Sequence, residues 1–308
     1  MSALRQAVDD YLAVRRALGY KLTIHGRVLP QFVEFLEARG AAQITTSLAL
    51  AWATQPVDAS VIWWHQRLAI VRGFALYLQA SDPRTEVPPV KLLPAKFRRA
   101  VPYLYSEADV EALMGAARRI RSALKAATYE TLIGLLTVTG MRIGEAIALN
   151  RADVELQQRR LAVRHAKNGR SREVALHPST VTALEDYARL RDELCPHAKD
   201  PSFLITNVGT RLDYGTVWHE FDRMRRRSGL DRESLGRQVR MHDLRHAFVL
   251  RTLLGWYHED RDVEAQLPLL ATFLGHVDPS STYWYFEAAP ELLTLAAQRL
   301  ERTWEQRS

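Results

Sequence analysis

The sequence predicts a mainly α-helical protein with one small β-hairpin or sheet, divided into two domains. Three observations lead to this prediction. Apolar residues recur at the spacing of amphipathic helices through most of the chain. The dipeptide Asn168-Gly169 lies between two short stretches of strand character, which is the strongest short-range signal for a hairpin. The chain has 308 residues, more than the roughly 100 to 200 residues of a usual single domain.

The first domain is expected to span residues 1–82 and to consist of helices. Apolar stripes with helical spacing run through four stretches, and the last one ends near Ser81. We expect Ser47 to cap a short helix that continues to Ala53. Pro30 is expected near the start of the preceding helix, or as a kink within it.

Residues 83–102 are expected to form a basic, proline-rich linker. The stretch from residue 82 to residue 102 contains five prolines and five basic residues, and its prolines exclude a continuous helix. The linker could be a plain spacer, or a strap that lies against phosphate groups. In the second case Lys91, Lys96, Arg98 and Arg99 would each neutralise one phosphate.

The second domain is expected to span residues 103–308. Ser106 is a plausible cap for its first helix, and residues 128–139 have the composition of a buried helix. The hairpin follows, and then helical stripes through residues 184–194, 216–229, 243–257 and 262–274. Pro290 is expected to start a last amphipathic helix, which could pack on its own chain or dock into a neighbouring copy.

Composition narrows the possible partners and the compartment. The formal net charge of +7 favours a polyanionic partner, provided that the basic residues gather on one face. The run at residues 223–227 holds four arginines on an expected helix, but it could equally be a solvated face. The single cysteine, Cys195, excludes an intrachain disulfide. We find neither an apolar stretch long enough for a membrane span nor a secretory signal, and therefore expect a cytoplasmic protein.

Four segments carry candidate chemistry, and each is ordinary when taken alone. Arg142 could simply pair with Glu145, three residues further on. Lys167 lies beside the turn, where solvated lysines are common. His242 and His246 have a spacing that can bind a metal, but the sequence offers neither an HExxH pattern nor a cysteine pair, so we expect no metal and no cofactor.

Taken together, the segments are far more specific. Their order is Arg, Lys, His-x-x-Arg, His and Tyr, with Tyr285 nine residues after His276. This order and spacing resemble the catalytic set of the tyrosine recombinases (phage integrases), over residues 103–290. The helical first domain resembles the core-binding domain of that family, so the resemblance implies this domain followed by a tyrosine-recombinase catalytic domain. The catalytic set that it implies is Arg142, Lys167, His242, Arg245, His276 and Tyr285.

The residue types suit a metal-independent cleavage and rejoining of DNA through a covalent phosphotyrosyl intermediate, and the resemblance implies that this is a 3′-phosphotyrosyl bond. The phenol of Tyr285 can attack phosphorus and keep the bond energy in a covalent adduct. Two arginines can clamp one phosphate, because guanidinium groups are planar, always charged and able to donate paired hydrogen bonds. The resemblance implies that Lys167 is the general acid, and that His242 and His276 assist proton transfer and phosphate binding.

Three further residues are expected to support the set: Glu145 and His246 by orienting the arginines, and Asp243 by capping the helix of Arg245. The hairpin differs from the Gly-Lys-Gly pattern of many family members. Arg170 and Arg172 lie near Lys167 in the sequence, so either arginine is an alternative for the position assigned to Lys167. The segment between Arg245 and His276 is also longer than in compact members.

The resemblance implies double-stranded DNA as partner, two protomers on each site, four in the synapse, and strand exchange through a Holliday junction. The end of the catalytic segment, TYWYFEAAPELL, resembles members from mobile elements. One alternative is a type IB topoisomerase, which uses a similar residue set, and a second is a DNA-binding protein without catalysis. A metal-dependent hydrolase is a third, but it would leave the arginines without a role.

Overall fold

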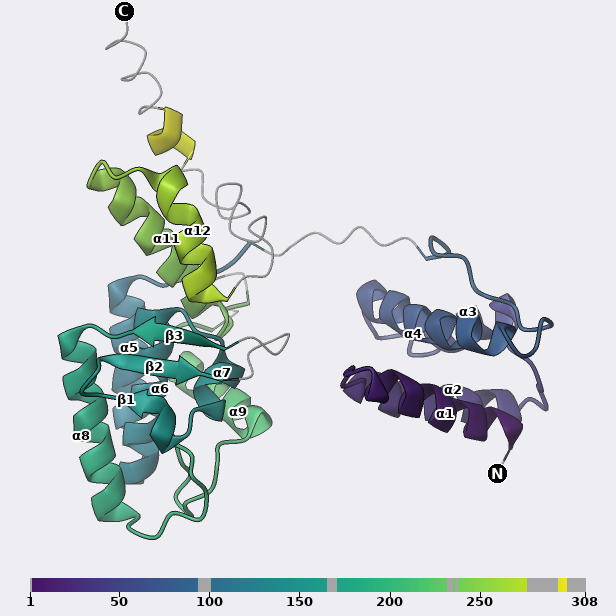
Figure 1. Cartoon of the computed structure of the whole chain (residues 1–308), viewed down its shortest axis with the longest axis horizontal. Coiled ribbons are helices and arrows are strands. Elements are labelled where there is room, and N and C mark those ends of the chain that lie inside the picture. The colour runs from purple at the N-terminus through teal and green to yellow at the C-terminus, as the bar shows by residue number, and fades with distance from the viewer. Residues whose placement is uncertain are drawn as a thin grey trace, which may run out of the picture. The chain divides into compact units, whose positions relative to one another are not determined.

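The computed structural model describes residues 2–93, 101–164, 171–231, 235, 238–275 and 293–297. It has two compact units, Met1–Ala100 and Val101–Ser308 (Figure 1). Over the described residues the chain is mainly helical with a small antiparallel sheet, which confirms the predicted fold class. None of the helices in these ranges is both long and apolar enough to cross a lipid bilayer.

The first unit packs its helices around one apolar core. Phe32, Trp52 and Phe74 are almost fully buried in it, and the rings of Phe32 and Trp52 lie 5.1 Å apart. Pro30 lies inside the second helix. Thr45, and not Ser47, caps the third helix by accepting a hydrogen bond from the backbone of Leu48 at 3.3 Å. The helices are α1 (Ala3–Ala17), α2 (Thr23–Glu37), α3 (Thr46–Thr54) and α4 (Val61–Gln79).

The described part of the expected linker packs on this first unit. Val87, Leu92 and Leu93 lie against its apolar core. The backbone N–H of Glu86 donates to the carbonyl of Ile44 at 2.9 Å, and the Glu86 carboxylate accepts from the backbone of Thr46 at 2.7 Å. Residues 83–93 are therefore structural parts of the first unit. Residues 94–100 lie outside the described residues.

The second unit is built around α6, a largely buried helix. Helices α5, α8 and α11 pack against it, and α12 packs beside α11 and β3 (Figure 1). Ser106 caps α5 in a reciprocal arrangement with Asp109, as expected from the sequence. The helices are α5 (Glu107–Arg118), α6 (Ala123–Thr139), α7 (Ile143–Ala148), the 3-10 turn η1 (Arg151–Asp153), α8 (Pro178–Leu194), α9 (Tyr214–Arg227), α11 (Asp243–His258) and α12 (Val263–Leu274).

A three-stranded antiparallel sheet, in the order β1-β2-β3, completes the second unit. The predicted hairpin strands are β2 (Arg160–Val163) and β3 (Arg172–Ala175), with Val163 opposite Arg172. The sequence did not predict β1 (Val154–Glu155), which pairs with β2. The hairpin tip with Asn168-Gly169 lies outside the described residues. The register nevertheless places Arg172 opposite Val163, at the end of the two-stranded pairing.

Candidate active site

The placement of Arg142 begins with the end of α6. Gly140 ends this helix in the left-handed conformation, with φ of 59°, which costs glycine little because it has no Cβ. Met141 is buried, and Arg142 then immediately precedes α7. The chain thus turns sharply between two helices and presents a half-buried Arg142, whose side chain is 26% exposed.

Arg245 lies in the first turn of α11 and is 2% exposed. Its Nη1 donates to the carbonyl oxygen of Gly140 at 2.7 Å. Its Nη2 donates to the carbonyl oxygen of Leu274, the last residue of α12, at 2.8 Å. The guanidinium group therefore fastens the start of α11 to the ends of α6 and α12.

Arg142 reaches the same end of α12. Its Nη1 lies 3.5 Å from the carbonyl oxygen of Leu274, and its Nη2 donates to the carbonyl oxygen of Gly275 at 3.2 Å. The guanidinium groups of Arg142 and Arg245 thus converge on one backbone oxygen. The carbonyl groups at a helix C-terminus carry partial negative charge, which offsets the repulsion between two neighbouring cations.

Glu145 holds Arg142 from the other side. Its carboxylate accepts hydrogen bonds from the backbone N–H and from Nη1 of Arg142, both at 2.9 Å. Burial acts to raise the pKa of Glu145, but hydrogen bonds from Arg172 and Arg142 outweigh this effect and lower the pKa to about 2. Glu145 is therefore a carboxylate at neutral pH and orients Arg142.

Arg172 completes this ion-pair cluster. Its Nη1 and Nη2 donate to the two carboxylate oxygens of Glu145 at 3.1 and 2.7 Å, and its Nε donates to the carbonyl oxygen of Phe273 at 2.8 Å. The sequence pattern presented Arg172 only as an alternative to Lys167. Its position at the start of the second hairpin strand was the one sequence signal for these contacts. A prediction of the strand register could have indicated that its side chain faces the helices.

His242 directly precedes α11, and one part of it is exposed while the ring lies partly against the protein. Its pKa is lowered from the ordinary value, first by the loss of water around the ring and then by the positive charge of Arg245. The ring of His246 meets that of His242 edge to face, with 4.9 Å between centroids. A neutral imidazole at neutral pH is suited to accept a proton.

Asp243 is fully buried beneath these residues. Helix α11 begins at Asp243 itself, so this residue is not the N-cap that we expected. Its carboxylate instead accepts hydrogen bonds from the backbone N–H of Arg240 at 2.9 Å and from its Nη2 at 3.1 Å. Asp243 therefore fixes the turn that leads to His242 and Arg245.

A sequence profile of the phage integrase family matches residues 104–291, which include all six expected catalytic positions. The chain belongs to the phage integrase family. Members of this family, the tyrosine recombinases, break and rejoin DNA. The y4rB protein of Sinorhizobium fredii, which carries the name of an integrase/recombinase, is 44% identical over 314 residues, and the match covers 100% of both chains.

Two solved structures show the same fold as this phage integrase. The Tn1549 transposon integrase, in complex with transposon right end DNA, matches with a TM-score of 0.69 and 16% identity, over 98% of this chain and 99% of its own. A lambda integrase from a tetramer bound to a Holliday junction matches with a TM-score of 0.61 and 19% identity, over 92% of this chain and 76% of its own.

The remaining expected site residues of this integrase are only partly within the described ranges. Lys91 is exposed in the first unit. Gly275, whose carbonyl binds Arg142, directly precedes His276, so the chain passes from the arginine cluster into the segment that carries His276 and Tyr285. The positions that lie outside the described residues are Lys96, Arg98, Arg99, Lys167, His276 and Tyr285.

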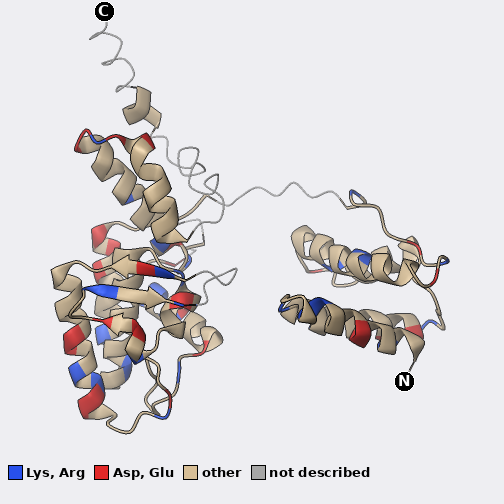
Figure 2. Ribbon diagram, in the orientation of Figure 1, with Lys and Arg blue, Asp and Glu red and all other residues tan. Residues whose placement is uncertain are grey.

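The arginine run at residues 223–227 is partly paired with acidic residues of its own helix. Arg223 pairs with Glu220 at 3.1 Å, and Arg225 and Arg226 pair with Asp222 at 2.6 and 3.0 Å. Figure 2 shows acidic and basic residues interspersed along the helices of this unit. Three of the four arginines are therefore tied to two carboxylates, although the run keeps an excess of positive charge.

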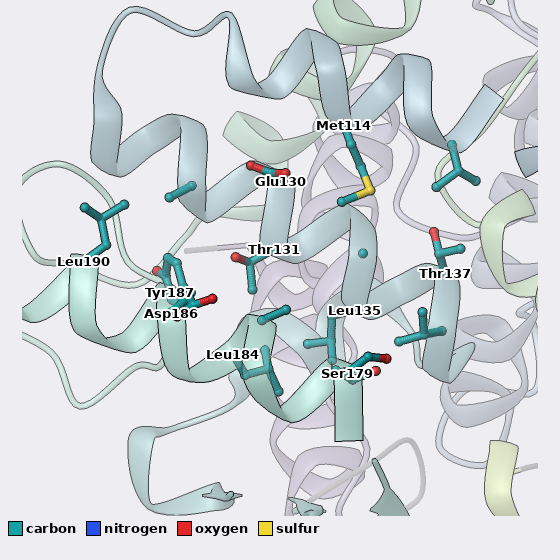
Figure 3. A pocket seen from close by; sticks show the side chains of 16 residues that line it. Met114, Glu130, Thr131, Leu135, Thr137, Ser179, Leu184, Asp186, Tyr187 and Leu190 are labelled. Atoms are coloured by element: carbon teal, nitrogen blue, oxygen red, sulfur yellow. The ribbon is translucent and has the colours of Figure 1, made fainter. Parts of the chain in front are cut away.

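A mostly apolar pocket of about 500 Å³ lies between α5, α6 and α8 (Figure 3). Met114, Leu135, Leu184 and Tyr187 line it. None of the expected catalytic or supporting residues contributes to this pocket. Because the two guanidinium groups meet elsewhere in the unit, the pocket is separate from the candidate active site.

Proposed function

We propose that this tyrosine recombinase cuts and rejoins mobile-element DNA through a 3′-phosphotyrosyl bond to Tyr285, without a metal ion. The observation that carries the proposal is the convergence of Arg142 and Arg245 on the carbonyl oxygen of Leu274. Two fixed cations beside one another can stabilise the charge that develops on the non-bridging oxygens of a phosphate. They supply the role that metal ions have in many other phosphoryl-transfer enzymes.

In the proposed reaction, the phenolic oxygen of Tyr285 attacks the scissile phosphorus. The bond from phosphorus to the 5′ oxygen breaks, and Lys167 protonates the leaving oxygen. His242 accepts the phenol proton, for which its lowered pKa suits it. His276 donates a hydrogen bond to the phosphate. In the second step, the 5′ hydroxyl of another strand attacks the phosphorus and gives its proton to Lys167, while the bond to Tyr285 breaks and the phenol recovers its proton from His242.

Three residues support these steps without contacting DNA. Glu145 holds Arg142 through two hydrogen bonds. Asp243 holds the turn before α11. His246 packs against His242 and limits the orientations of that ring. Each of these contacts keeps a phosphate-binding or proton-accepting group in one position, which favours the transition state.

For assembly, we propose that two copies of the chain bind each DNA site and that four form the synapse, in which strands are exchanged through a Holliday junction. The lambda integrase tetramer on a Holliday junction supports this arrangement. Residues 293–297, which follow Pro290, are helical. We propose that this C-terminal helix docks into a neighbouring copy. A chain truncated at Pro290 that still assembled cooperatively on DNA would contradict trans docking.

The proposed place of action is the cytoplasm, on the nucleoid, because the substrate is chromosomal or element DNA. The likeness to the Tn1549 transposon integrase, over nearly its full length, supports a mobile-element role. Lys91, Lys96, Arg98 and Arg99, which lie close together in the sequence, are proposed to bind phosphate groups. Replacing all four with alanine should reduce the slope of log affinity against log salt by about 1 for each lost contact.

The deciding experiment is covalent capture from a duplex library. Each duplex carries the candidate element's end and a nick close to the expected cleavage point. Cleavage then releases a short fragment with the free 5′ hydroxyl, which diffuses away and cannot reverse the reaction, so the adduct accumulates. Sequencing the DNA that stays bound under denaturing conditions identifies the cleaved site. The proposal predicts adducts with the wild-type chain and none with Tyr285→Phe. Absence of any wild-type adduct, with DNA still bound, would indicate a DNA-binding protein without catalysis.

A further inference from the structure

We propose that Arg172 is a positioning residue for DNA cleavage, which sets the two phosphate-binding arginines without touching DNA itself. The inference rests on the proposed function, since it concerns the same phosphate site. It gives β3, the second strand of the hairpin, a role in holding the phosphate-binding arginines. Two sets of contacts and one further observation support it.

The first set joins Arg172 to Glu145. Arg172 donates to Oε1 of Glu145 at 3.1 Å and to Oε2 at 2.7 Å. Oε1 also accepts from Nη1 of Arg142, and Oε2 accepts from the backbone N–H of Arg142. Each oxygen of this buried carboxylate is thus shared by both arginines. If the bonds from Arg172 were lost, the carboxylate of Glu145 could rotate, and this rotation would move Arg142.

The second set joins Arg172 to the end of α12. Its Nε donates to the carbonyl oxygen of Phe273 at 2.8 Å, and its Nη1 lies 2.9 Å from where a Cβ on Gly275 would be. The carbonyl group between these two residues belongs to Leu274, the acceptor that Arg142 and Arg245 share. Arg172 therefore holds the backbone on one side of the point where the two arginines meet and lies close to Gly275 on the other.

The third observation is that the charge of Arg172 is already paired with a protein carboxylate. Its Nη1 and Nη2 donate to both oxygens of Glu145, and its Nε donates to a backbone carbonyl. A direct bond to phosphate would have to break the paired hydrogen bonds to Glu145. Guanidinium groups also stay charged in proteins, so an arginine is poorly suited to act as a general acid.

The geometry requires a guanidinium group. A fork with fixed angles can bind both carboxylate oxygens and a separate carbonyl at once. Lysine has a point charge and cannot reproduce all three bonds from one nitrogen. Arg172→Lys therefore keeps the positive charge but loosens the placement of Glu145 and Leu274. A misplacement of roughly 1 Å at a reacting centre can slow chemistry by about 100-fold.

The test uses the full-length chain and the duplex recovered by covalent capture. Equilibrium binding and the single-turnover rate of adduct formation are measured for wild type, Arg172→Lys and Arg191→Lys. Arg191 is a matched control, since it is 5% exposed and donates to the carbonyl oxygen of Ser202 at 2.9 Å and to Asp192 at 2.7 Å. It contacts none of the proposed site residues.

We expect Arg172→Lys to bind the duplex with wild-type affinity and to form the adduct about 100-fold more slowly. Arg191→Lys should cleave at the wild-type rate, even if it melts at a lower temperature. Equal cleavage rates for Arg172→Lys and wild type would overturn the proposal. So would a loss of duplex affinity as large as the loss of rate, because it would point to direct DNA contact. Wild-type cleavage on the same duplex shows separately that the proposed function holds.

A double variant tests whether Arg172 acts through Glu145. If it does, Glu145→Gln combined with Arg172→Lys should be little slower than the slower single variant. Rate losses that multiply would show that the two residues act independently, which would overturn the positioning role through Glu145. Should Arg172→Lys fail to fold, Arg172→Gln replaces it in both measurements. Its amide keeps hydrogen-bond donors in the same space, and the same outcomes decide.

Discussion

Arg142 and Arg245 donate hydrogen bonds to one shared acceptor, the carbonyl oxygen of Leu274, over 3.5 and 2.8 Å. The two residues come from different helices, and only the folded chain brings them together. The shared acceptor fixes how far apart their guanidinium groups lie. It also leaves Arg142 the more exposed of the pair. We expect the phosphate to enter from the side of Arg142, with Arg245 beneath it.

The first prediction concerns these two arginines. Arg142→Lys and Arg245→Lys each keep one positive charge but lose the paired donors. Each should slow adduct formation by about 100- to 1,000-fold, the usual effect of losing one transition-state donor. Duplex affinity should fall much less, because most of it comes from the many other phosphate contacts. Single-turnover cleavage and equilibrium binding on the captured duplex measure the two effects.

Arg191→Lys is again the control for burying a lysine in place of a buried arginine. If Arg142→Lys cleaved as fast as this control, the phosphate would be bound elsewhere. Arg245→Lys carries a second, structural consequence, because Arg245 also bonds to the carbonyl of Gly140 at 2.7 Å. Its melting temperature should therefore fall more than that of Arg142→Lys.

The second prediction concerns the nucleophile. Tyr285→Phe removes only the phenolic oxygen, so it should bind the captured duplex normally and form no covalent adduct. Tyr283→Phe is the matched control, two residues away in the same segment, and should form the adduct at the wild-type rate. Denaturing electrophoresis of the labelled duplex, with and without protease, measures both. An adduct in Tyr285→Phe that disappears only when Tyr283 is also changed would move the nucleophile to Tyr283.

Most helices of the fold could be predicted from the sequence, because helix caps and apolar spacing depend only on residues that are close together in the chain. Ser106 before Glu107 and Asp109 correctly marked the start of α5. The same reasoning chose Ser47 for α3, although Thr45 is the cap. Both hydroxyl groups are near the helix start, and the backbone conformation decides between them. Prolines in residues 83–93 correctly excluded a helix, but they do not exclude burial against a core.

The candidate site was predictable as a set of residue types, and its supporting contacts were not. The order of Arg142, His242 and Arg245 along the chain indicated the phosphate clamp. The acceptor that unites them is a backbone carbonyl, which no side-chain pattern can reveal. Likewise, the bond between Arg172 and Glu145 depends on how a strand and a short helix pack. Such contacts follow from tertiary structure rather than from spacing.

The third prediction concerns acid stability. Glu145 has its pKa lowered from 4.5 to about 2, so the fold favours its carboxylate form. The resulting stabilisation, about 3 kcal/mol, is complete above about pH 5 and is lost as the pH falls toward 2. About 2 kcal/mol of it should be lost between pH 5 and pH 3. Urea denaturation of the full chain at these two pH values, followed by circular dichroism, measures the change.

Glu145→Gln cannot ionise, so it should lack this part of the pH dependence. Its free energy of unfolding at pH 5 should be lower than that of wild type, since the amide cannot replace the charged acceptor of Arg142 and Arg172. The difference between the two proteins should shrink as the pH falls to 3. A difference that stayed constant over this range would show that Glu145 does not titrate as proposed.

The fourth prediction concerns the pH dependence of cleavage. Loss of water around the ring lowers the pKa of His242, as does the nearby charge of Arg245, while Asp243 acts in the opposite direction. If the neutral ring accepts the phenol proton, the cleavage rate should stay flat as the pH falls from 7.5 to 6.5. It should decline only at lower pH, where the ring becomes protonated. Single-turnover rates from pH 7.5 down into the acidic range, where the ring becomes protonated, measure the profile.

His242→Gln removes the titrating ring and keeps a polar side chain. It should cleave more slowly at pH 7.5, and its rate should lack the decline that His242 causes in the acidic range. The pH range stays above the pKa of Glu145, so that carboxylate does not contribute. A decline that remained unchanged in His242→Gln would assign the proton transfer to another group.

The fifth prediction concerns the glycine that turns the chain toward Arg142. Gly140 has a φ of 59°, and a Cβ there would lie 2.9 Å from Cγ of Phe248. Gly140→Ala should therefore combine a backbone cost of about 1 to 2 kcal/mol with a clash that forces Phe248 or the turn to move. Because the Gly140 carbonyl binds Arg245, the movement should also slow cleavage.

Gly40 offers a matched control in the first unit. Its φ is 64°, and a Cβ there would meet no atom within 4 Å. Gly40→Ala should therefore show the backbone cost alone, with cleavage unchanged. Thermal melting and single-turnover cleavage of the two variants separate the conformational cost from the steric one. If both variants lost the same stability and both cleaved at the wild-type rate, the close contact with Phe248 would have no part in holding the arginines.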